Sequence, residues 1–205
     1  ALVTADSPDG RLLLVLDLGD DAVTPVPGTW QAVGMDDSDS LDVTVGSAHV
    51  EAGAAVGPPG FYVQRPGLSV GGMGVAAVWW GGARGIVDAL TTALTQRDPT
   101  EHQLAHLGAC ASAVTRGAAV LDRAAVAVDA DPGGDHRSLS QHVRHEMEQV
   151  ADEVVRRAGR ITGAGPLCRD AAYARSVADL TVFVRQHHAE ADLARLGRAT
   201  LERRA

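Results

Sequence analysis

The sequence predicts an α+β protein, in which a partial antiparallel β-barrel or sandwich is followed by an antiparallel four-helix bundle. Up to about residue 72, apolar residues occur in short runs or with period two. From residue 74 onward they recur with a helical period. We therefore expect a partial β-domain over residues 1–72 and a helical bundle over residues 73–205, with the boundary near Gly71 and Gly72.

The first part contains several short segments with strand character. Residues 11–17 form a nearly continuous apolar run after the turn residues Asp9 and Gly10, which predicts a central strand. Residues 30–34 and 41–45 alternate between apolar and polar side chains, as half-buried strands do. Residues 50–56 are a weaker candidate. Several short strands at this spacing favour a compact antiparallel barrel or sandwich.

The second part contains four long stretches of helical period. We expect these helices over residues 75–96, 99–128, 138–161 and 170–204. Breaks rich in glycine and proline separate the last three, and the fourth stretch is expected to bend near Gly197. Long amphipathic helices with short connections favour antiparallel neighbours in a bundle.

Composition limits the possible function classes. The chain has 205 residues, of which 45% are hydrophobic, enough for a substantial core. Its net charge is −8, and all of its 18 basic residues are arginine. An acidic chain without a basic run is a poor candidate for binding nucleic acid or an anionic membrane. Because no signal peptide or long uninterrupted apolar run is recognisable, we expect a soluble, cytoplasmic protein.

The two cysteines and the first residue each lead to an expectation. Cys110 and Cys168 have no second cysteine or histidine at metal-ligand spacing, so we expect buried, reduced thiols and no metal-binding residues. The sequence opens at Ala1, directly in a segment with strand character. We therefore expect that an upstream segment was removed or is supplied by another polypeptide.

Four motifs, in order along the whole chain, resemble the acyl-CoA dehydrogenase family. Residues 30–35 with Ser38 and Ser40 are similar to a segment of that family's middle β-domain, and residues 56–60 are similar to the turn that follows it. Residues 65–85 resemble the start of the family's C-terminal bundle. Residues 163–170 resemble a shortened form of the glycine turn and Arg-Asp pair between its last two helices.

The resemblance implies a flavoprotein. It implies FAD bound between the β-domain and the bundle, an N-terminal helical domain that this chain lacks, and assembly as dimers or tetramers. The implied substrate is a small molecule, with an acyl thioester as the first class to consider. Trp79 and Trp80 are consecutive and face different sides of a helix, so one of them needs a second surface to cover it, such as the β-domain or a partner subunit. We therefore expect a homo-oligomer.

Three residues are candidates for cofactor binding by this resemblance. Arg97 matches the arginine that contacts the FAD pyrophosphate of a neighbouring subunit in the family, although the Phe and Gly that follow it there are Thr100 and Glu101 here. Gly163 and Gly165 match the family's cofactor-facing glycine turn. The alternative interpretations are a solvated arginine at a helix end and a simple helix stop.

The expected catalytic base is missing. The resemblance places the family's glutamate at Ala178, and the alternative position, on the first bundle helix, falls on Val75 and Ala76. Asp179 is adjacent to Ala178 but points about 100° away around a helix. No carboxylate therefore occupies either expected position, and Asp179 is only a weak candidate.

The remaining chemically active group is the histidine pair His187 and His188, because histidine transfers protons near neutral pH. Adjacent histidines on a helix point apart, although His187 with Glu190, or His188 with Asp192, would share a face. The alternative is a polar, partly exposed helix surface. The other histidines of the helical part are expected on solvated faces: His102, His106, His142 and His145.

These observations leave three functional hypotheses. The leading one is an FAD-dependent oxidoreductase similar to acyl-CoA dehydrogenases. The second is a catalytically degenerate relative that acts as a structural partner of an active subunit. The third is a flavin-dependent monooxygenase, in which oxygen chemistry removes the need for an α-proton base.

Overall fold

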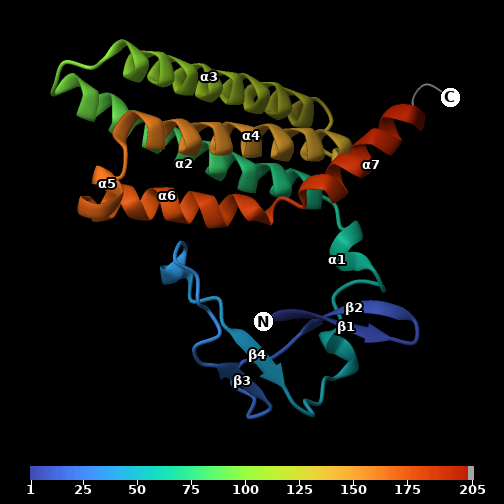
Figure 1. Cartoon of the computed structure of the whole chain (residues 1–205). Coiled ribbons are helices and arrows are strands. Elements are labelled where there is room, and N and C mark those ends of the chain that lie inside the picture. Colours follow the sequence, from blue (N-terminus) through green and yellow to red (C-terminus); the bar gives the residue numbers. More distant parts are fainter. Residues whose placement is uncertain (203–205) are drawn as a thin grey trace. The chain divides into compact units, whose positions relative to one another are not determined.

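The computed structural model describes residues 1–202, apart from the side chain of Ala52. The chain divides into two compact units (Figure 1). The first contains residues 1–31 and 36–68, and the second contains residues 32–35 and 69 onward. Each unit has its own secondary structure, β in the first and helical in the second.

The first unit begins with a β-hairpin. Strands β1 (Leu2–Ser7) and β2 (Gly10–Val15) pair antiparallel, with Ser7 opposite Gly10 across a two-residue loop. Gly10 has φ +117°, a conformation that a side chain rarely adopts, so glycine is required to start β2. On β2 only Leu13 is fully buried, so the hairpin contributes little to a core.

The predicted barrel or sandwich does not form within residues 1–202. Strands β3 (Val23–Val26) and β4 (Asp42–Val45) make a second antiparallel pair, separate from the first. Residues 30–34, predicted as a strand, have irregular backbone, and residues 50–56 contain only the 3-10 helix η2 (Ala52–Ala54) and a single bridge at Ala55. Because these two strands are absent, the two small sheets do not join into a barrel or sandwich within residues 1–202.

The second unit is helical. Its long helices are α2 (Leu68–Thr95), α3 (Glu101–Ala130), α4 (Arg137–Thr162) and α6 (Ala171–Phe183). They run alternately in opposite directions (Figure 1). The shorter helices are α1 (Phe61–Gln64) in the first unit, and α5 (Gly165–Arg169), the 3-10 helix η3 (Val184–Gln186) and α7 (Ala189–Glu202) in the second. The region from 100 to 200, all of it described, contains no strand.

Two helix boundaries differ from the prediction. The first long helix begins at Leu68, so Gly71 and Gly72 lie inside it rather than at its start. The fourth predicted helix is divided into α6 and α7 at residues 184–188, whereas Gly197, where a bend was expected, lies within α7. No glycine or proline marks this break, which explains why the apolar period did not reveal it.

The core of the helical unit is built mainly from α2, α3 and α4. Its largest fully buried side chains are aliphatic or aromatic: Trp79, Ile86 and Leu90 from α2, and Val143, Met147, Val150 and Val154 from α4. Cys110 is buried on α3, as expected, but Cys168 is exposed, contrary to expectation. The core is therefore built mostly from aliphatic side chains, with Trp79 as its largest fully buried residue.

Trp80 finds its partner inside the chain. Its Nε1 donates a hydrogen bond to the carbonyl of Val114 on α3 at 2.8 Å. A Cβ at Gly117 would lie 2.6 Å from the indole ring, so glycine makes room for it. The second surface that one of the two tryptophans was expected to need is therefore α3 of the same chain, and not the β-domain or a partner subunit.

Candidate functional site

A groove lies along the helical unit between α2 and α6. Its volume is about 360 Å³, at the small end of the range typical of small-molecule pockets. Gly82 and Gly85 leave bare backbone on the α2 side, and Ser176, Asp179 and Phe183 lie on the α6 side. Val78, Ile86 and Leu180 complete the lining. The groove is mostly apolar and offers one hydroxyl and one carboxylate.

Asp179, the weak candidate for a catalytic base, is engaged by the backbone. Its Oδ1 accepts a hydrogen bond from the Met35 amide at 2.6 Å. Gly34 is buried against the same helix, and a Cβ there would lie 2.1 Å from the carbonyl oxygen of Ala178. Gly34 and Met35 therefore pack directly on the turn of α6 where the resemblance places the family's glutamate. Asp179 anchors this segment instead of standing free at the groove.

Arg97, Gly163 and Gly165 lie at a different place, the end of the helical unit where α2 ends, α3 begins and α4 ends (Figure 1). Arg97 is exposed. Gly163 has φ +62°, and its amide donates to the carbonyl of Gly159 to close α4. Nothing lies within 4 Å of a Cβ built on either glycine. The helix-stop interpretation of Gly163 is confirmed by this geometry.

The start of α3 at this end is held by a capping box. The Thr100 side chain accepts from the amide of Gln103, and the Gln103 side chain accepts from the amide of Thr100. Gln103 also donates through Nε2 to the carbonyl of Ile161 at the end of α4, at 2.8 Å. This arrangement fixes the start of α3 beside the glycine turn. Thr100, which departs from the family's motif, has a structural role here.

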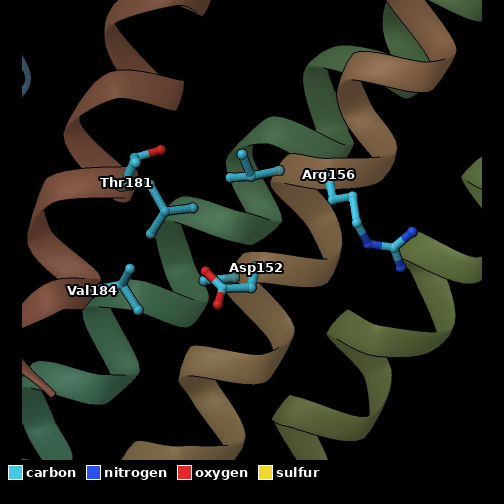
Figure 2. A pocket seen from close by; sticks show the side chains of 7 residues that line it. Asp152, Arg156, Thr181 and Val184 are labelled. Atoms are coloured by element: carbon cyan, nitrogen blue, oxygen red, sulfur yellow. The ribbon is translucent and has the colours of Figure 1, made fainter. Parts of the chain in front are cut away.

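A second, smaller hollow lies between α4 and α6. Its volume is about 170 Å³, below the usual size of a ligand pocket. Figure 2 shows Asp152 and Arg156 from α4 and Thr181 and Val184 on the opposite side. The Arg156 side chain extends away from Thr181 and Val184. Asp152 accepts a hydrogen bond from Arg185 at 2.5 Å. We interpret this small hollow as a gap in helix packing and not as a binding site.

The two adjacent histidines have opposite surroundings. The His187 side chain is completely buried at the end of η3, whereas that of His188 is 73% exposed. Burial lowers the pKa of His187 below its ordinary value, because charging the ring away from water is unfavourable. The predicted polar, partly exposed surface is thus correct for His188 and wrong for His187. His187 lies at the opposite end of the helical unit from Arg97.

The other histidines also divide. His102 and His142 are exposed, as expected, whereas His106 and His145 are partly buried. The Nδ1 atom of His106 lies 3.2 Å from the Arg157 guanidinium, and burial together with Arg157 lowers the pKa of His106. The structure therefore separates the predicted site residues into three places: the groove at Asp179, the bundle end at Arg97, and the α6–α7 break at His187.

No family model matches this sequence, and no curated protein sequence matches it significantly. Solved structures do match over nearly the whole chain. Acyl-CoA dehydrogenase from Geobacillus kaustophilus superposes with a TM-score of 0.86 at 18% identity, covering 97% of this chain and 56% of that one. The chain has the acyl-CoA dehydrogenase fold.

Two flavin-bound structures share the same fold. TdsC from Paenibacillus sp. A11-2, solved with FMN and indole, gives a TM-score of 0.81 at 17% identity and covers 98% of this chain and 59% of that one. KijD3, solved with FMN and a dTDP-sugar, gives 0.81 at 21% identity and covers 98% and 54%. This chain therefore spans a little over half the length of the proteins that share its acyl-CoA dehydrogenase fold.

Proposed function

We propose that this chain is part of a flavin-dependent oxidoreductase, in which the groove between α2 and α6 receives the flavin ring. The observation that carries the proposal is the match in fold to flavin-bound structures along 98% of the chain. A soluble protein acting on a small-molecule substrate is consistent with that fold. A bound flavin would supply the acceptor for a hydride or an electron pair.

The residues of the groove suit one side of a flat ring system. Gly82 and Gly85 let a planar group approach the backbone of α2, and a Cβ at Gly82 would already be 3.3 Å from Leu180. Val78 and Phe183 supply apolar contact, and Ser176 supplies a hydroxyl at the rim. The groove is open on one side, so these residues form one wall, and a second surface has to complete the site.

The choice between FAD and FMN depends on Arg97. The end of α2 at Thr95 is roughly 15 Å beyond Gly85, since each helical residue advances about 1.5 Å, and Arg97 follows two residues later. A guanidinium suits a pyrophosphate, which FAD has and FMN lacks. FAD remains our proposed cofactor, with Arg97, Gly163 and Gly165 at its phosphate end. Arg97→Ala is expected to weaken FAD binding and leave FMN binding unchanged, whereas equal effects on both would remove Arg97 from the site.

The groove does not favour efficient acyl-thioester dehydrogenation. Ala178 has no ionisable group, and the Asp179 carboxylate is occupied by the Met35 amide. General-base catalysis typically contributes about 10²–10⁴-fold, so its loss would leave a slow dehydrogenase. A monooxygenase does not need this base, and a monooxygenase is among the proteins with the same fold. Oxygen-dependent turnover is therefore the first activity to assay, beside a panel of acyl-CoA thioesters.

A second candidate function is that of a degenerate partner subunit. The engaged Asp179, and a groove that is open on one side, favour it. The test is whether the purified protein binds flavin at all. We expect flavin absorption after purification or after titration with FAD or FMN, and a colourless protein that binds neither would support the structural role.

Two glycine substitutions test the location. Gly85→Phe fills the groove, whereas Gly108→Phe lies on α3 and does not line it. A Cβ meets nothing within 4 Å at either position, so both variants are expected to fold. Flavin binding should weaken at least about tenfold in Gly85→Phe and stay unchanged in Gly108→Phe. If both variants bind flavin equally well, the flavin ring does not lie in the groove between α2 and α6.

A further inference from the structure

A buried polar cluster lies where α6 ends and α7 begins, and none of its residues lines the groove. It consists of His145 and Glu148 on α4, His187 at the end of η3, and Asp192 on α7. The His187 side chain is completely buried, and the side chains of Glu148 and Asp192 are 8% and 9% exposed. Polar groups buried this deeply almost always have hydrogen-bond partners.

The histidines in this cluster lack such partners. Nδ1 of His145 and both ring nitrogens of His187 are buried without a hydrogen bond to any described residue. Nε2 of His187 lies 3.6 Å from Oε2 of Glu148, and Nδ1 of His145 lies 3.8 Å from the same oxygen. These separations are too long for good hydrogen bonds. They are close to the distance of about 3.4 Å that separates two ligands of one tetrahedral zinc ion.

Two arginines orient the carboxylates toward the histidines. Arg185 contacts Oε1 of Glu148 at 3.4 Å, so the other oxygen, Oε2, is left facing both rings. Arg195 donates to Oδ1 of Asp192 at 2.7 Å, while Oδ2 lies 3.5 Å from Nδ1 of His187. Each carboxylate therefore has one oxygen held by an arginine and one directed at a histidine. A structural ion pair alone would not require both histidines to remain without hydrogen bonds.

The neighbouring cation is also directed away from the cluster. Arg144 donates to the carbonyls of Gly72 and Gln186, and its guanidinium lies 4.7 Å above the ring of Trp79. The Arg144 guanidinium therefore donates hydrogen bonds to backbone carbonyls and makes a cation–π contact with Trp79. The three potential ligand atoms, one each from His145, Glu148 and His187, all lie within 4.8 Å of one another.

We propose that His145 Nδ1, Glu148 Oε2 and His187 Nε2 bind one divalent transition-metal ion, with Zn²⁺ as the best fit. Two imidazoles and a carboxylate form a ligand set that zinc uses, with a fourth position left for water. Oδ2 of Asp192, 3.5 Å from Nδ1 of His187, is the carboxylate oxygen that would accept from this nitrogen and hold the ring once Nε2 binds the ion, as carboxylates commonly do behind metal-bound histidines. The ion would join α4 to the α6–α7 break, independently of any flavin.

The sequence predicts no metal-binding residues because the ligands are far apart along the chain. Only the pair His145 and Glu148, three residues apart on one helix, gives a local signal. His187 joins them through the break after η3, which turns its ring inward. The sequence predicts a helix that continues through residues 184–188. The spacing of residues along such a helix gives no indication that the His187 ring contacts α4.

The test is metal titration of the full chain after removal of metals with EDTA. We expect one equivalent of Co²⁺ or Zn²⁺ per chain, with the visible absorption of four-coordinate Co²⁺. Glu148→Gln, His187→Ala and His145→Ala should each abolish stoichiometric binding. Asp192→Asn should retain the stoichiometry with roughly 10–100-fold weaker affinity. The matched control is His142→Ala, which removes an exposed histidine from the same helix one turn earlier and should bind like the unmodified chain.

Two outcomes would overturn the proposal. One is the absence of stoichiometric binding by folded, unmodified protein at saturating Zn²⁺. The other is binding that survives in Glu148→Gln and His187→Ala. Circular dichroism separates loss of a ligand from loss of folding, and Glu148→Gln preserves side-chain shape if His187→Ala does not fold. Zn²⁺ should also raise the melting temperature of the unmodified chain and His142→Ala, but not of Glu148→Gln.

Discussion

Asp179 is a structural carboxylate and not a free catalytic base, because it accepts a hydrogen bond from the backbone. The sequence places an aspartate beside the position expected for a catalytic glutamate. It contains no information that the Met35 amide will occupy that carboxylate at 2.6 Å. The same holds for Gly34, which lies within a segment predicted as a strand but is required because its backbone touches the carbonyl of Ala178. Partners distant in sequence decided both roles.

Gly34→Ala is therefore expected to destabilise the protein. A Cβ would lie 2.1 Å from the carbonyl oxygen of Ala178, and backbone on both sides leaves little room to adjust. We expect a loss of about 1–3 kcal/mol in the free energy of unfolding, measured by denaturant titration. Gly53→Ala is the control, because nothing lies within 4 Å of a Cβ there. Unchanged stability in Gly34→Ala would mean that this segment does not rest on α6.

The two cysteines should differ in reactivity. Burial raises the pKa of the Cys110 thiol, which lowers its thiolate fraction, and also blocks access to it. Cys168 is exposed. A thiol-specific disulfide reagent should modify one cysteine in the native protein and the second only after unfolding. Cys168→Ser should remove the fast reaction. A fast reaction that persists in that variant would show that the core around Cys110 opens readily.

At the scale of elements, the period of apolar residues predicted the long helices but not their tertiary use. The helices expected near residues 75–96, 99–128 and 138–161 correspond to α2, α3 and α4, with ends shifted by several residues for α2. The break at 184–188 was missed because its residues are compatible with a helix, and packing rather than glycine or proline ends it there. The predicted strand at 30–34 failed because alternation alone does not supply a pairing partner.

A charged group on α4 links that helix to α3. Glu153 accepts hydrogen bonds from Arg157 at 2.9 Å and from Arg116 of α3 at 3.4 Å. The hydrogen bond from Arg157, with Arg116 nearby, lowers the pKa of Glu153 below its ordinary value. Its stabilisation is therefore present above the pKa of the unfolded carboxyl, about 4.3, and is lost as the pH falls through the lower folded value.

Glu153→Gln should thus cost about 0.5–1 kcal/mol near neutral pH and progressively less in acid. The measurement is the free energy of unfolding as a function of pH. Asp88→Asn is the control, since it removes an exposed pair with Arg84 within α2 and should change little. A cost that does not change between neutral and acid pH would point to packing, instead of charge, as the role of Glu153.

At the scale of the whole molecule, assembly remains a prediction. The resemblance implies a homo-oligomer, whereas the argument from Trp80 no longer supports one. A different surface supports a homo-oligomer. Helix α3 exposes large apolar side chains, with Val126 69% and Leu104 43% exposed. It is also the described helix long and apolar enough to cross a membrane by composition, which for a single helix is weak evidence.

We expect light scattering to give the mass of a homo-oligomer that buries more than about 1,000 Å². Val126→Asp should shift it toward the monomer, while Val63→Asp, on α1, should not. A monomer at micromolar concentration would contradict the prediction. A protein that stays in solution only with detergent would instead support a membrane role for α3. This test does not depend on flavin or metal.

The attachment of α7 has a consequence for local unfolding. Only Asp192 and Leu196 of this helix are buried, so α7 docks with little buried apolar surface. Helices with little buried apolar surface open at lower free energy than the global transition. Amides of α7 should therefore exchange hydrogen through a separate, low-energy opening, while those of α2 and α4 wait for complete unfolding. In native-state hydrogen exchange, α7 would behave as its own cooperative unit. The contact of Asp192 with His187 would hold this unit to the rest of the helical bundle.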